Sequence, residues 1–383
     1  MIWIHFGAYQ SGQMSTFNGS QLAITGNVII VTIQYRLNVF GFLSTGDIKD
    51  NYRLWDQILA IRWVNENIDS FGGDKQSVTI FGEDAGSFSV GLLTLIPSNT
   101  GLFQKAIMKS GTSMSFSLQG PYTEAASVNI LEYLRYPTTE TNMSIDCLRK
   151  LPAEILIEAY SAEKTAQDGA LPFIIPLTPV IDGELLTNDP IELLENTESE
   201  ASIFYRSLDV VIGTVSGEES ILLKAFQSGL QDIFHFDVND HLPRHFICNE
   251  LAPAMSALTY GNNSKVTKAV CEEYGKSSNE IELIKSILFA FSDFIFNVPT
   301  ARSLRLHSEI SSGKDRHYQY LLCPLHPYFK LLFHFPSWFD GAIHSAEIVL
   351  VYLFPNVEIP LTCQDEDLKT RLMKYWTNFA KTW

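Results

Sequence analysis

The first third of the chain alternates short apolar runs with a clearly amphipathic segment. Asn27–Leu37 is a long run rich in β-branched residues, which is typical of a parallel strand covered on both faces. Asn51–Ile68 instead repeats apolar residues at helical spacing, and the glycines after Phe71 end that pattern. Further buried strands are predicted at Met1–Phe6, Ser77–Phe81 and Lys105–Thr112, with a second helix at Ser87–Ile96. The order strand, strand, helix, strand, helix, strand predicts an α/β fold with a mainly parallel central sheet.

A helical interval separates these elements from the later strands. Residues 120–207 are predicted to form a large, mainly helical insertion, with Ile145–Tyr160 as its best helix. A strand, a helix, a strand and a closing helix are then predicted at Leu208–Ser220, Glu280–Glu309, Arg316–Leu322 and Asp365–Trp383. The sequence has no internal repeat and no low-complexity tract, so we expect residues 1–383 to form a single domain.

The charge balance excludes two classes of partner. The chain has 27 basic and 43 acidic residues, a formal net charge of −16, and no basic run interrupts the acidic excess. Such a surface repels nucleic acid and anionic membranes, so we expect neither as a partner. No apolar run reaches the ~18 residues that a membrane helix needs. The amino-terminal segment lacks the basic start and the apolar length of a signal peptide.

The five cysteines show no metal-ligand spacing, so we expect no metal site and no other cofactor. Because their number is odd, at least one thiol has no partner within the chain. Three Asn-x-Ser sequons, at Asn18, Asn142 and Asn262, permit glycosylation if the chain is secreted.

The stretch SVTIFGEDAGSFSV, Ser77–Val90, carries a motif that indicates chemistry. A predicted strand leads into a Gly-x-nucleophile-x-Gly turn and then into a helix, which is the arrangement of a nucleophile elbow. The glycines, Gly82 and Gly86, leave room for a strained turn that lifts the central side chain into a pocket. The first helical turn then presents free N–H groups to an oxyanion. The central residue is Asp84, where a hydrolase of this kind would place a serine.

Around this elbow the chain resembles the type-B carboxylesterase and cholinesterase-like family. Six stretches are similar to family segments and occur in the family's order: VTIQYRLNVFGFLSTGD, LWDQILAIRWVNENIDSFGG, FGGDKQSVTIFGEDAG, GLFQKAIMKSGTS, PVIDGELLTNDP and YWTNFAK. GFLSTGD and YWTNFAK are as similar to the neuroligin-type adhesion members as to the esterases. The resemblance spans nearly the whole chain and implies an α/β-hydrolase fold. The family has segments before Met1 and after Trp383, so we expect the fold to be truncated at both ends.

The resemblance also implies the other members of a catalytic triad. VIGTVSGEES matches the turn that carries the family's acid, which implies Glu218, with the adjacent Glu219 as the less suitable choice. GAIHSAE matches the family's histidine loop and implies His344. Nucleophile position, acid and histidine then follow in the order expected of an α/β-hydrolase.

The oxyanion hole is implied in the same way. The loop His5-Phe6-Gly7-Ala8 resembles the family's glycine-rich run, so the matching N–H donors are Gly7 and Ala8, with Ala85 after the elbow. Phe6 replaces a family glycine. We expect this ring to restrict the loop backbone and to alter the geometry of the hole.

An aspartate at the apex is compatible with three functions. A carboxylate that attacks an ester would form a mixed anhydride, and its charge lies beside donors meant for a developing oxyanion. The favoured interpretation is therefore a family member with impaired or lost serine-esterase activity and a binding or adhesion role. The alternative is an active hydrolase of the epoxide or haloalkane type, in which Asp84 attacks a saturated carbon and His344 directs water. Residual ester hydrolysis is the third.

Burial and repulsion among Asp84, Glu83 and Glu218 are expected to raise the pKa of at least one of these carboxyl groups. By resemblance, we expect a small ester-like ligand or a cell-surface protein as partner, and an extracellular or cell-surface location. A family member would carry a cysteine near Tyr136 to pair with Cys147, and none is present there. An aromatic cluster is expected to pack in the core rather than line a pocket: Tyr328, Phe329, Phe333, Phe335, Trp338 and Phe339.

Overall fold

The computed structural model describes most of the chain. The described residues are 1–44, 50–115, 120–137, 146–168, 175–223, 246–260, 262–277, 279–309, 316–323, 335–352 and 360–382. The sequon at Asn142 and three members of the aromatic cluster, Tyr328, Phe329 and Phe333, lie outside the described residues.

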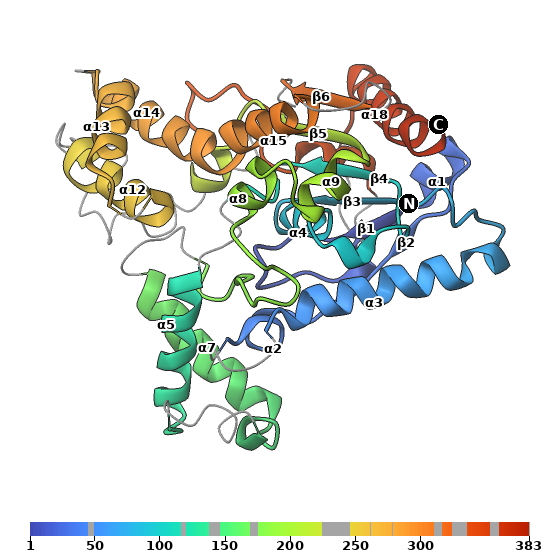
Figure 1. The fold of residues 1–383 in the computed structure, drawn as a ribbon. Coiled ribbons are helices and arrows are strands. Elements are labelled where there is room, and N and C mark those ends of the chain that lie inside the picture. Colours follow the sequence, from blue (N-terminus) through green and yellow to red (C-terminus); the bar gives the residue numbers. More distant parts are fainter. Residues whose placement is uncertain are drawn as a thin grey trace.

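Six strands in the described part of the chain form one sheet (Figure 1). They are β1 (Ile2–Ile4), β2 (Val31–Thr32), β3 (Thr79–Glu83), β4 (Lys105–Lys109), β5 (Asp209–Val215) and β6 (His317–Leu322). Their order across the sheet is β2-β1-β3-β4-β5-β6, and each neighbouring pair is parallel. The predicted parallel sheet is confirmed. The direction of winding reverses between β1 and β3, and the crevice at the carboxyl ends of two such strands is the usual place for a site in an open α/β sheet.

Helices surround this sheet. In chain order they are α1 (Ser20–Gly26), α2 (Asn38–Phe42), α3 (Tyr52–Asn67), α4 (Ala85–Leu93), α5 (Gly120–Tyr133), α7 (Ala153–Asp168), α8 (Pro190–Glu195), α9 (Glu200–Arg206), α12 (Ala252–Tyr260), α13 (Ser264–Tyr274), α14 (Glu280–Ser292), α15 (Val298–Ser308), α17 (Ala346–Val351) and α18 (Cys363–Lys381). Short 3₁₀ segments are η1 (Met14–Thr16), η2 (Ile68–Phe71) and η3 (Pro97–Asn99), and two π-helical turns are η4 (Ile247–Leu251) and η5 (Asp293–Asn297).

Alternate residues of the strands point to opposite faces of the sheet and fill two cores. Ile80 and Ile212 pack with residues of α3, α4, α9 and α15 on one face. Phe81 and Val211 pack with residues of α1, α17 and α18 on the other. A third cluster joins residues of α2, α5, α7, α12 and α14. Of these helices, α5, α7 and α12 to α14 lie on the left in Figure 1, away from the two chain ends. The sheet is thus covered on both faces, as the apolar strands require.

The strand predicted at Asn27–Leu37 was too long. Only Val31 and Thr32 pair with β1, and both are half-buried. The reason is that β2 is the last strand on one side of the sheet in the described part of the chain, and its neighbour there, β1, extends only over Ile2–Ile4. A strand cannot continue its ladder of backbone hydrogen bonds beyond the end of its partner strand, even where its residues are β-branched.

The helix predicted at Ile145–Tyr160 is interrupted, and the prediction ended too early. Ile145 lies outside the described residues, and residues 146–148 are helical as predicted. α7 begins at Ala153 and continues to Asp168. Pro152 has no N–H group for a helix and its ring clashes with the preceding turn, so a helix cannot continue through this position. Residues 149–151 leave the helical conformation in a turn in which the Lys150 N–H donates to the Cys147 carbonyl at 3.0 Å. The helical prediction for Glu280–Glu309 is confirmed up to Ser308, because α14, η5 and α15 follow one another without a break.

The remaining aromatic residues pack as predicted. Phe339 is buried in the third core cluster, and Phe335 and Trp338 pack against it. Cys248 and Cys271 form a disulfide that joins η4 to α13, while Cys147, Cys323 and Cys363 are free thiols. The sequon residues Asn18 and Asn262 are exposed.

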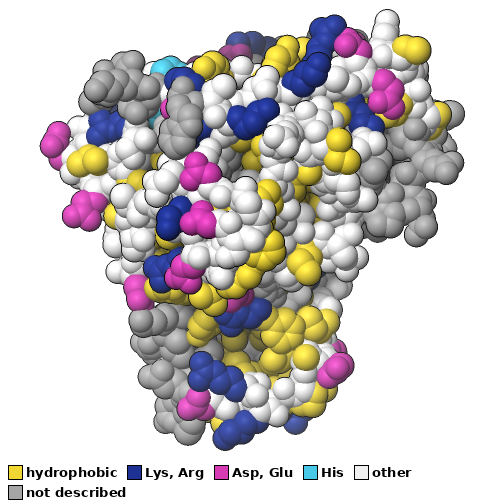
Figure 2. Space-filling model, turned by 90° about the vertical axis from the view of Figure 1, so that its right-hand side faces the viewer, with side chains coloured by type: hydrophobic (Ala, Val, Ile, Leu, Met, Phe, Trp, Pro, Cys, Tyr) yellow, Lys and Arg dark blue, Asp and Glu magenta, His cyan; other side chains and the backbone are white. Residues whose placement is uncertain are grey.

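The face in Figure 2, seen from the right-hand side of Figure 1, carries both signs of charge. Basic and acidic side chains are interspersed on it, and hydrophobic side chains gather around a hollow in its lower part. The net charge of −16 is therefore not concentrated on this face. None of the helices in the described ranges combines the length and the apolar character needed to cross a bilayer.

Candidate active site

The elbow predicted around Asp84 is present. Asp84 lies between β3 and α4 with φ 51° and ψ −124°, a backbone conformation that residues with a side chain rarely adopt. A Cβ at Gly86 would lie 2.1 Å from the carbonyl oxygen of Ile4, and a Cβ at Gly82 would lie 2.5 Å from the carbonyl of Gly86. Both positions therefore need glycine, and the turn presses directly against β1. The strain at Asp84 is held by this close packing of strand, turn and helix.

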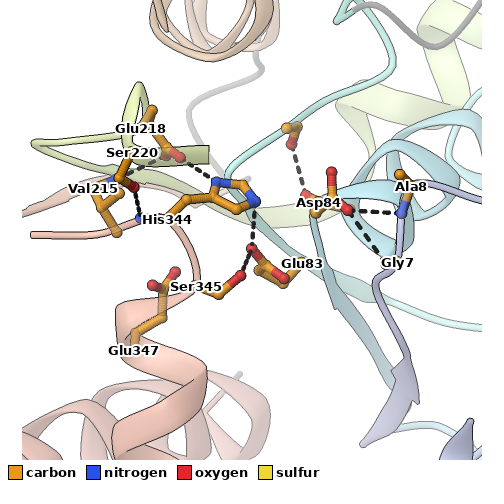
Figure 3. A network of polar contacts seen from close by, with 12 residues as sticks. Gly7, Ala8, Glu83, Asp84, Val215, Glu218, Ser220, His344, Ser345 and Glu347 are labelled. Carbon is orange, nitrogen blue, oxygen red and sulfur yellow. Dashed lines mark hydrogen bonds and ion pairs between the residues drawn. The ribbon is translucent and has the colours of Figure 1, made fainter. Parts of the chain in front are cut away.

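The carboxylate of Asp84 turns toward the loop that follows β1 (Figure 3). Its Oδ2 atom accepts the N–H groups of Gly7 at 3.3 Å and of Ala8 at 3.1 Å. Gly7 has φ 124° and Ala8 has φ 49°, so the loop turns these two N–H groups to the same side. The third donor implied by resemblance, Ala85, is fully buried at the start of α4. Two of the three N–H groups expected to hold an oxyanion thus already hold an anion.

The substitution at Phe6 does not prevent this arrangement. Its ring packs edge-on against Phe17, with the ring centroids 5.2 Å apart, at the border of the core between the sheet and α1. The expectation that Phe6 would alter the hole is not supported at Gly7 and Ala8, because both still donate to one oxygen atom.

Glu218 and His344 meet on the neighbouring loops. Glu218 follows β5, and its Oε2 lies 2.6 Å from Nδ1 of His344. The backbone N–H of Val215 donates to the second oxygen of Glu218 at 2.9 Å. The backbone N–H of His344 donates to Oγ of Ser220 at 2.7 Å. A short bridge between Gly217 and Ile343 holds the two loops together. This is the acid–histidine pairing that resemblance implied, with Glu218 rather than Glu219 in contact.

The other ring nitrogen of His344 contacts a different carboxyl group. Nε2 lies 3.1 Å from Oε1 of Glu83, the residue before the elbow apex (Figure 3). The Ser345 hydroxyl donates to the same oxygen at 2.7 Å. Among the described contacts, no hydrogen bond joins His344 to Asp84. The structure therefore brings the predicted residues into two units: Asp84 with Gly7 and Ala8, and His344 with Glu218.

These contacts determine the protonation of His344. Burial by itself lowers the pKa of the imidazole, but the charges of Glu83 and Glu218 outweigh it and raise the pKa to about 10. Burial is also the main reason that the pKa of Glu83 lies well above its ordinary value, and Asp84 raises it further while His344 opposes the rise. The expectation of at least one raised carboxyl pKa is confirmed. Glu83 and His344 titrate as a pair, with both ring nitrogens of His344 protonated near neutral pH.

A second layer of buried charge lies beneath Glu83. Lys109, its neighbour across the β3–β4 pair, is fully buried with Nζ 3.1 Å from the centroid of the Trp376 ring. Burial lowers the pKa of Lys109 to about 7, although Glu347 and Glu83 both act to raise it. Glu347 accepts the Tyr320 hydroxyl at 2.9 Å on one oxygen. In the part of the chain that the structure describes, Lys109 Nζ and one oxygen each of Glu83 and Glu347 have no hydrogen-bond partner.

Sequence patterns did not reveal several of these contacts. Glu83 was recognised only as a nearby carboxylate, and its position on Nε2 was missed, as were Lys109 and Glu347. The available signals were local: Glu83 directly precedes the apex, and Glu347 lies three residues after His344. No group of three or more histidine, cysteine, aspartate or glutamate residues in the described ranges could hold a metal ion.

Comparisons with known proteins agree with this fold. The Carboxylesterase family profile matches residues 1–383. Bile salt-activated lipase of Rattus norvegicus is 31% identical over 398 residues, covering 100% of this chain and 61% of the lipase. Neuroligin-2 of Homo sapiens is 32% identical over 407 residues, covering 100% of this chain and 44% of that protein. Neuroligin-3 of Mus musculus is 32% identical over 399 residues, with the same two coverages. The chain spans less than two thirds of the length of these relatives. Because the family match extends over the full chain, this protein belongs to the carboxylesterase family and has its α/β-hydrolase fold.

Proposed function

We propose that this protein is a carboxylesterase-family member that does not hydrolyse esters and that acts by binding a partner. The observation that carries the proposal is that the Asp84 carboxylate accepts hydrogen bonds from the N–H groups of Gly7 and Ala8. An ester reaction at this site would develop a negative charge where one already resides. Like charge there disfavours the transition state that an oxyanion hole normally stabilises.

The histidine supports the same conclusion. A general base must hold a free nitrogen near the group that it deprotonates. In His344 the Nδ1 atom contacts Glu218 and the Nε2 atom contacts Glu83, and the raised pKa keeps the ring protonated near neutral pH. Loss of the serine alone costs roughly 10⁶-fold in a comparable triad. The missing hydroxyl and the occupied histidine act together against turnover.

The alternative in which Asp84 attacks a saturated carbon needs the same nitrogen. There the histidine must accept a proton from the water that attacks the alkyl-ester intermediate. An imidazolium whose two nitrogens are both protonated and both contact carboxyl groups cannot accept that proton. The geometry therefore favours binding over both kinds of hydrolysis. Since neuroligins are among the relatives, the partner we propose is a cell-surface protein, bound at an extracellular or cell-surface location, rather than a small ester-like ligand.

The proposal is tested by comparing the protein with His344→Ala. We expect equal, background rates of p-nitrophenyl acetate hydrolysis and no mass increase on Asp84 after incubation with a reactive epoxide or haloalkane. A cell-surface ectodomain captured by the protein should be captured equally by His344→Ala. Hydrolysis that disappears in His344→Ala, or an alkyl adduct on Asp84, would contradict the proposal.

A further inference from the structure

A small apolar pocket lies among the helices around the disulfide. Residues of α12, α13, α14, η5 and α15, which are yellow to orange in Figure 1, form most of its wall, and α8 and the segment after β4 complete it. Its volume is about 170 Å³, and most of its lining side chains are apolar. Asp84, Glu218 and His344 are not among them, so the pocket is separate from the elbow. An apolar cavity of about 150 Å³ is large enough to bind benzene. This pocket therefore has room for one small ring.

The polar side chains at the pocket already have partners. The Tyr274 hydroxyl donates to Oδ2 of Asp293 at 2.8 Å, and the Asn297 amide donates to Oδ1 of the same residue at 2.9 Å. Arg302 forms an ion pair with Glu195. A ligand with a charged group would have to displace one of these contacts or leave its own charge unpaired in apolar surroundings. The pocket therefore favours an uncharged ligand.

Several lining side chains favour an aromatic ring over an aliphatic one. Met114 and Met255 are both buried, and the sulfur of a methionine makes favourable contacts with aromatic rings. Phe294 adds a ring against which a second ring can pack offset or edge-on. The guanidinium of Arg302 can stack on a ring face while it keeps Glu195, because its N–H donors all point outward in the plane of the group.

One wall of the pocket depends on the disulfide. Val270 and Tyr274 of α13 line the pocket, yet α13 contains no buried residue. Cys271 lies between them in the same helix and is joined to Cys248 of η4. The hydrogen bond from Tyr274 to Asp293 is a second tie between α13 and η5. Because burial contributes little to the position of α13, the disulfide determines how firmly this wall is held.

We propose that this pocket binds a small uncharged aromatic molecule, about one ring in size, and that the Cys248–Cys271 disulfide keeps the pocket in its binding shape. The two buried methionines and Phe294 contact the ring, and Arg302 stacks on it. This site is independent of the proposed binding of a cell-surface protein, so a failure of either proposal leaves the other unchanged.

Fluorine NMR of the full chain with 4-fluorophenol tests the site. We expect binding with a dissociation constant of about 1 mM, as is usual for a ligand of this size. Val298→Phe places a ring in the pocket from a position that is 58% exposed, so the core is not disturbed, and it should weaken binding at least tenfold. Val128→Phe is the matched control. Val128 is 40% exposed on α5 and does not line the pocket, so its substitution should leave the affinity unchanged.

Competition separates an aromatic site from a general apolar one. Phenol should displace the fluorinated probe at a concentration at least fivefold lower than cyclohexanol, which has a similar size and the same hydroxyl group. Equal displacement by the two alcohols, or binding that Val298→Phe does not weaken, would overturn the proposal.

The role of the disulfide is tested separately. Cys248→Ser combined with Cys271→Ser should weaken binding of the probe at least threefold, and Cys323→Ser, which removes an exposed free thiol, should not. Reduction of the folded parent protein with a phosphine makes the same comparison without refolding. An affinity that survives both the double substitution and the reduction would show that the disulfide does not hold the wall.

Discussion

Nε2 of His344 lies 3.1 Å from Oε1 of Glu83, on the side of the ring that a hydrolase keeps for its nucleophile. The opposite nitrogen, Nδ1, lies 2.6 Å from Glu218. A neutral imidazole has one N–H group and one lone pair, so it cannot donate to two carboxylates at once. The doubly protonated ring can, and it then offsets one of the negative charges gathered at the elbow. With its pKa raised to about 10 by Glu83 and Glu218, His344 then acts as a buried cation near neutral pH.

The first prediction concerns stability and the charge on His344. Its pKa is about 10 in the folded protein against an ordinary value of 6.5, because Glu83 and Glu218 outweigh the effect of burial. Between these pH values the folded state binds a proton that the unfolded state has lost. The stabilisation is therefore complete below pH 6.5 and is lost as the pH rises to about 10.

Urea unfolding of the protein and of His344→Gln, followed from pH 6 to pH 10, measures this effect. We expect the free energies of unfolding to converge as the pH rises, by roughly a few kcal/mol in total. Two curves that stay parallel over this range would show that His344 is not protonated preferentially in the folded state.

Lys109 gives the opposite pH dependence. Burial lowers its pKa to about 7 from an ordinary 10.5, although Glu347 and Glu83 oppose the shift. Between these values the unfolded state binds the extra proton, so the contribution of Lys109 to stability rises with pH. We expect Lys109→Met to remove this rising contribution, so that stability falls more steeply from pH 7 to pH 10 than in the parent protein. Chemical denaturation at several pH values checks this, and an unchanged slope would contradict it.

A serine introduced at position 84 should not give full esterase activity. Asp84→Ser supplies a hydroxyl and removes the carboxylate that now accepts the N–H groups of Gly7 and Ala8. The Nε2 atom of His344, however, remains in contact with Glu83. We expect Asp84→Ser to hydrolyse p-nitrophenyl acetate weakly. Glu83→Gln in the same chain should raise the rate by roughly another 10²-fold, since a general base contributes about 10²–10⁴-fold once it is free.

The control for this rescue is Asp84→Ser combined with His344→Ala, which should return to the background rate. If Asp84→Ser alone reached the rate of the double variant, Glu83 would not restrain the histidine. The proposed inactivity would then rest on the missing hydroxyl alone.

Local backbone geometry was the most predictable part of the site. The need for glycine at positions 82 and 86 could be predicted from the elbow motif. The structure gives the reason, because at each position a neighbouring backbone excludes any side chain. The contact of Glu218 with His344 spans 126 residues, and only resemblance to a family indicated it. No local pattern encodes such a distance.

The side-chain direction of Glu83 was beyond prediction. Its carboxyl group is oriented by Ser345 and His344, which come from a loop more than 260 positions further along the chain. The burial of Arg53 was missed for a related reason: a single arginine in an amphipathic helix usually faces solvent, whereas this one is enclosed by the rings of Tyr9, Tyr35 and Phe42 from other segments. The length of β2 likewise depended on where β1 ends, which is a property of the partner strand and not of the run itself.

The last prediction tests the packing that holds the elbow. A Cβ at Gly86 would lie 2.1 Å from the carbonyl oxygen of Ile4, and neither backbone can move without disturbing the β1–β3 pair. We expect Gly86→Ala to lower the free energy of unfolding by about 3 kcal/mol or more, because an overpacked site forces the backbone apart. Gly72→Ala is the matched control. Gly72 has φ 80° but nothing within 4 Å of its would-be Cβ, so only the backbone preference is lost, about 1 kcal/mol. Urea unfolding of both variants decides the matter, and equal costs would mean that the strand does not press against the turn as closely as this geometry requires.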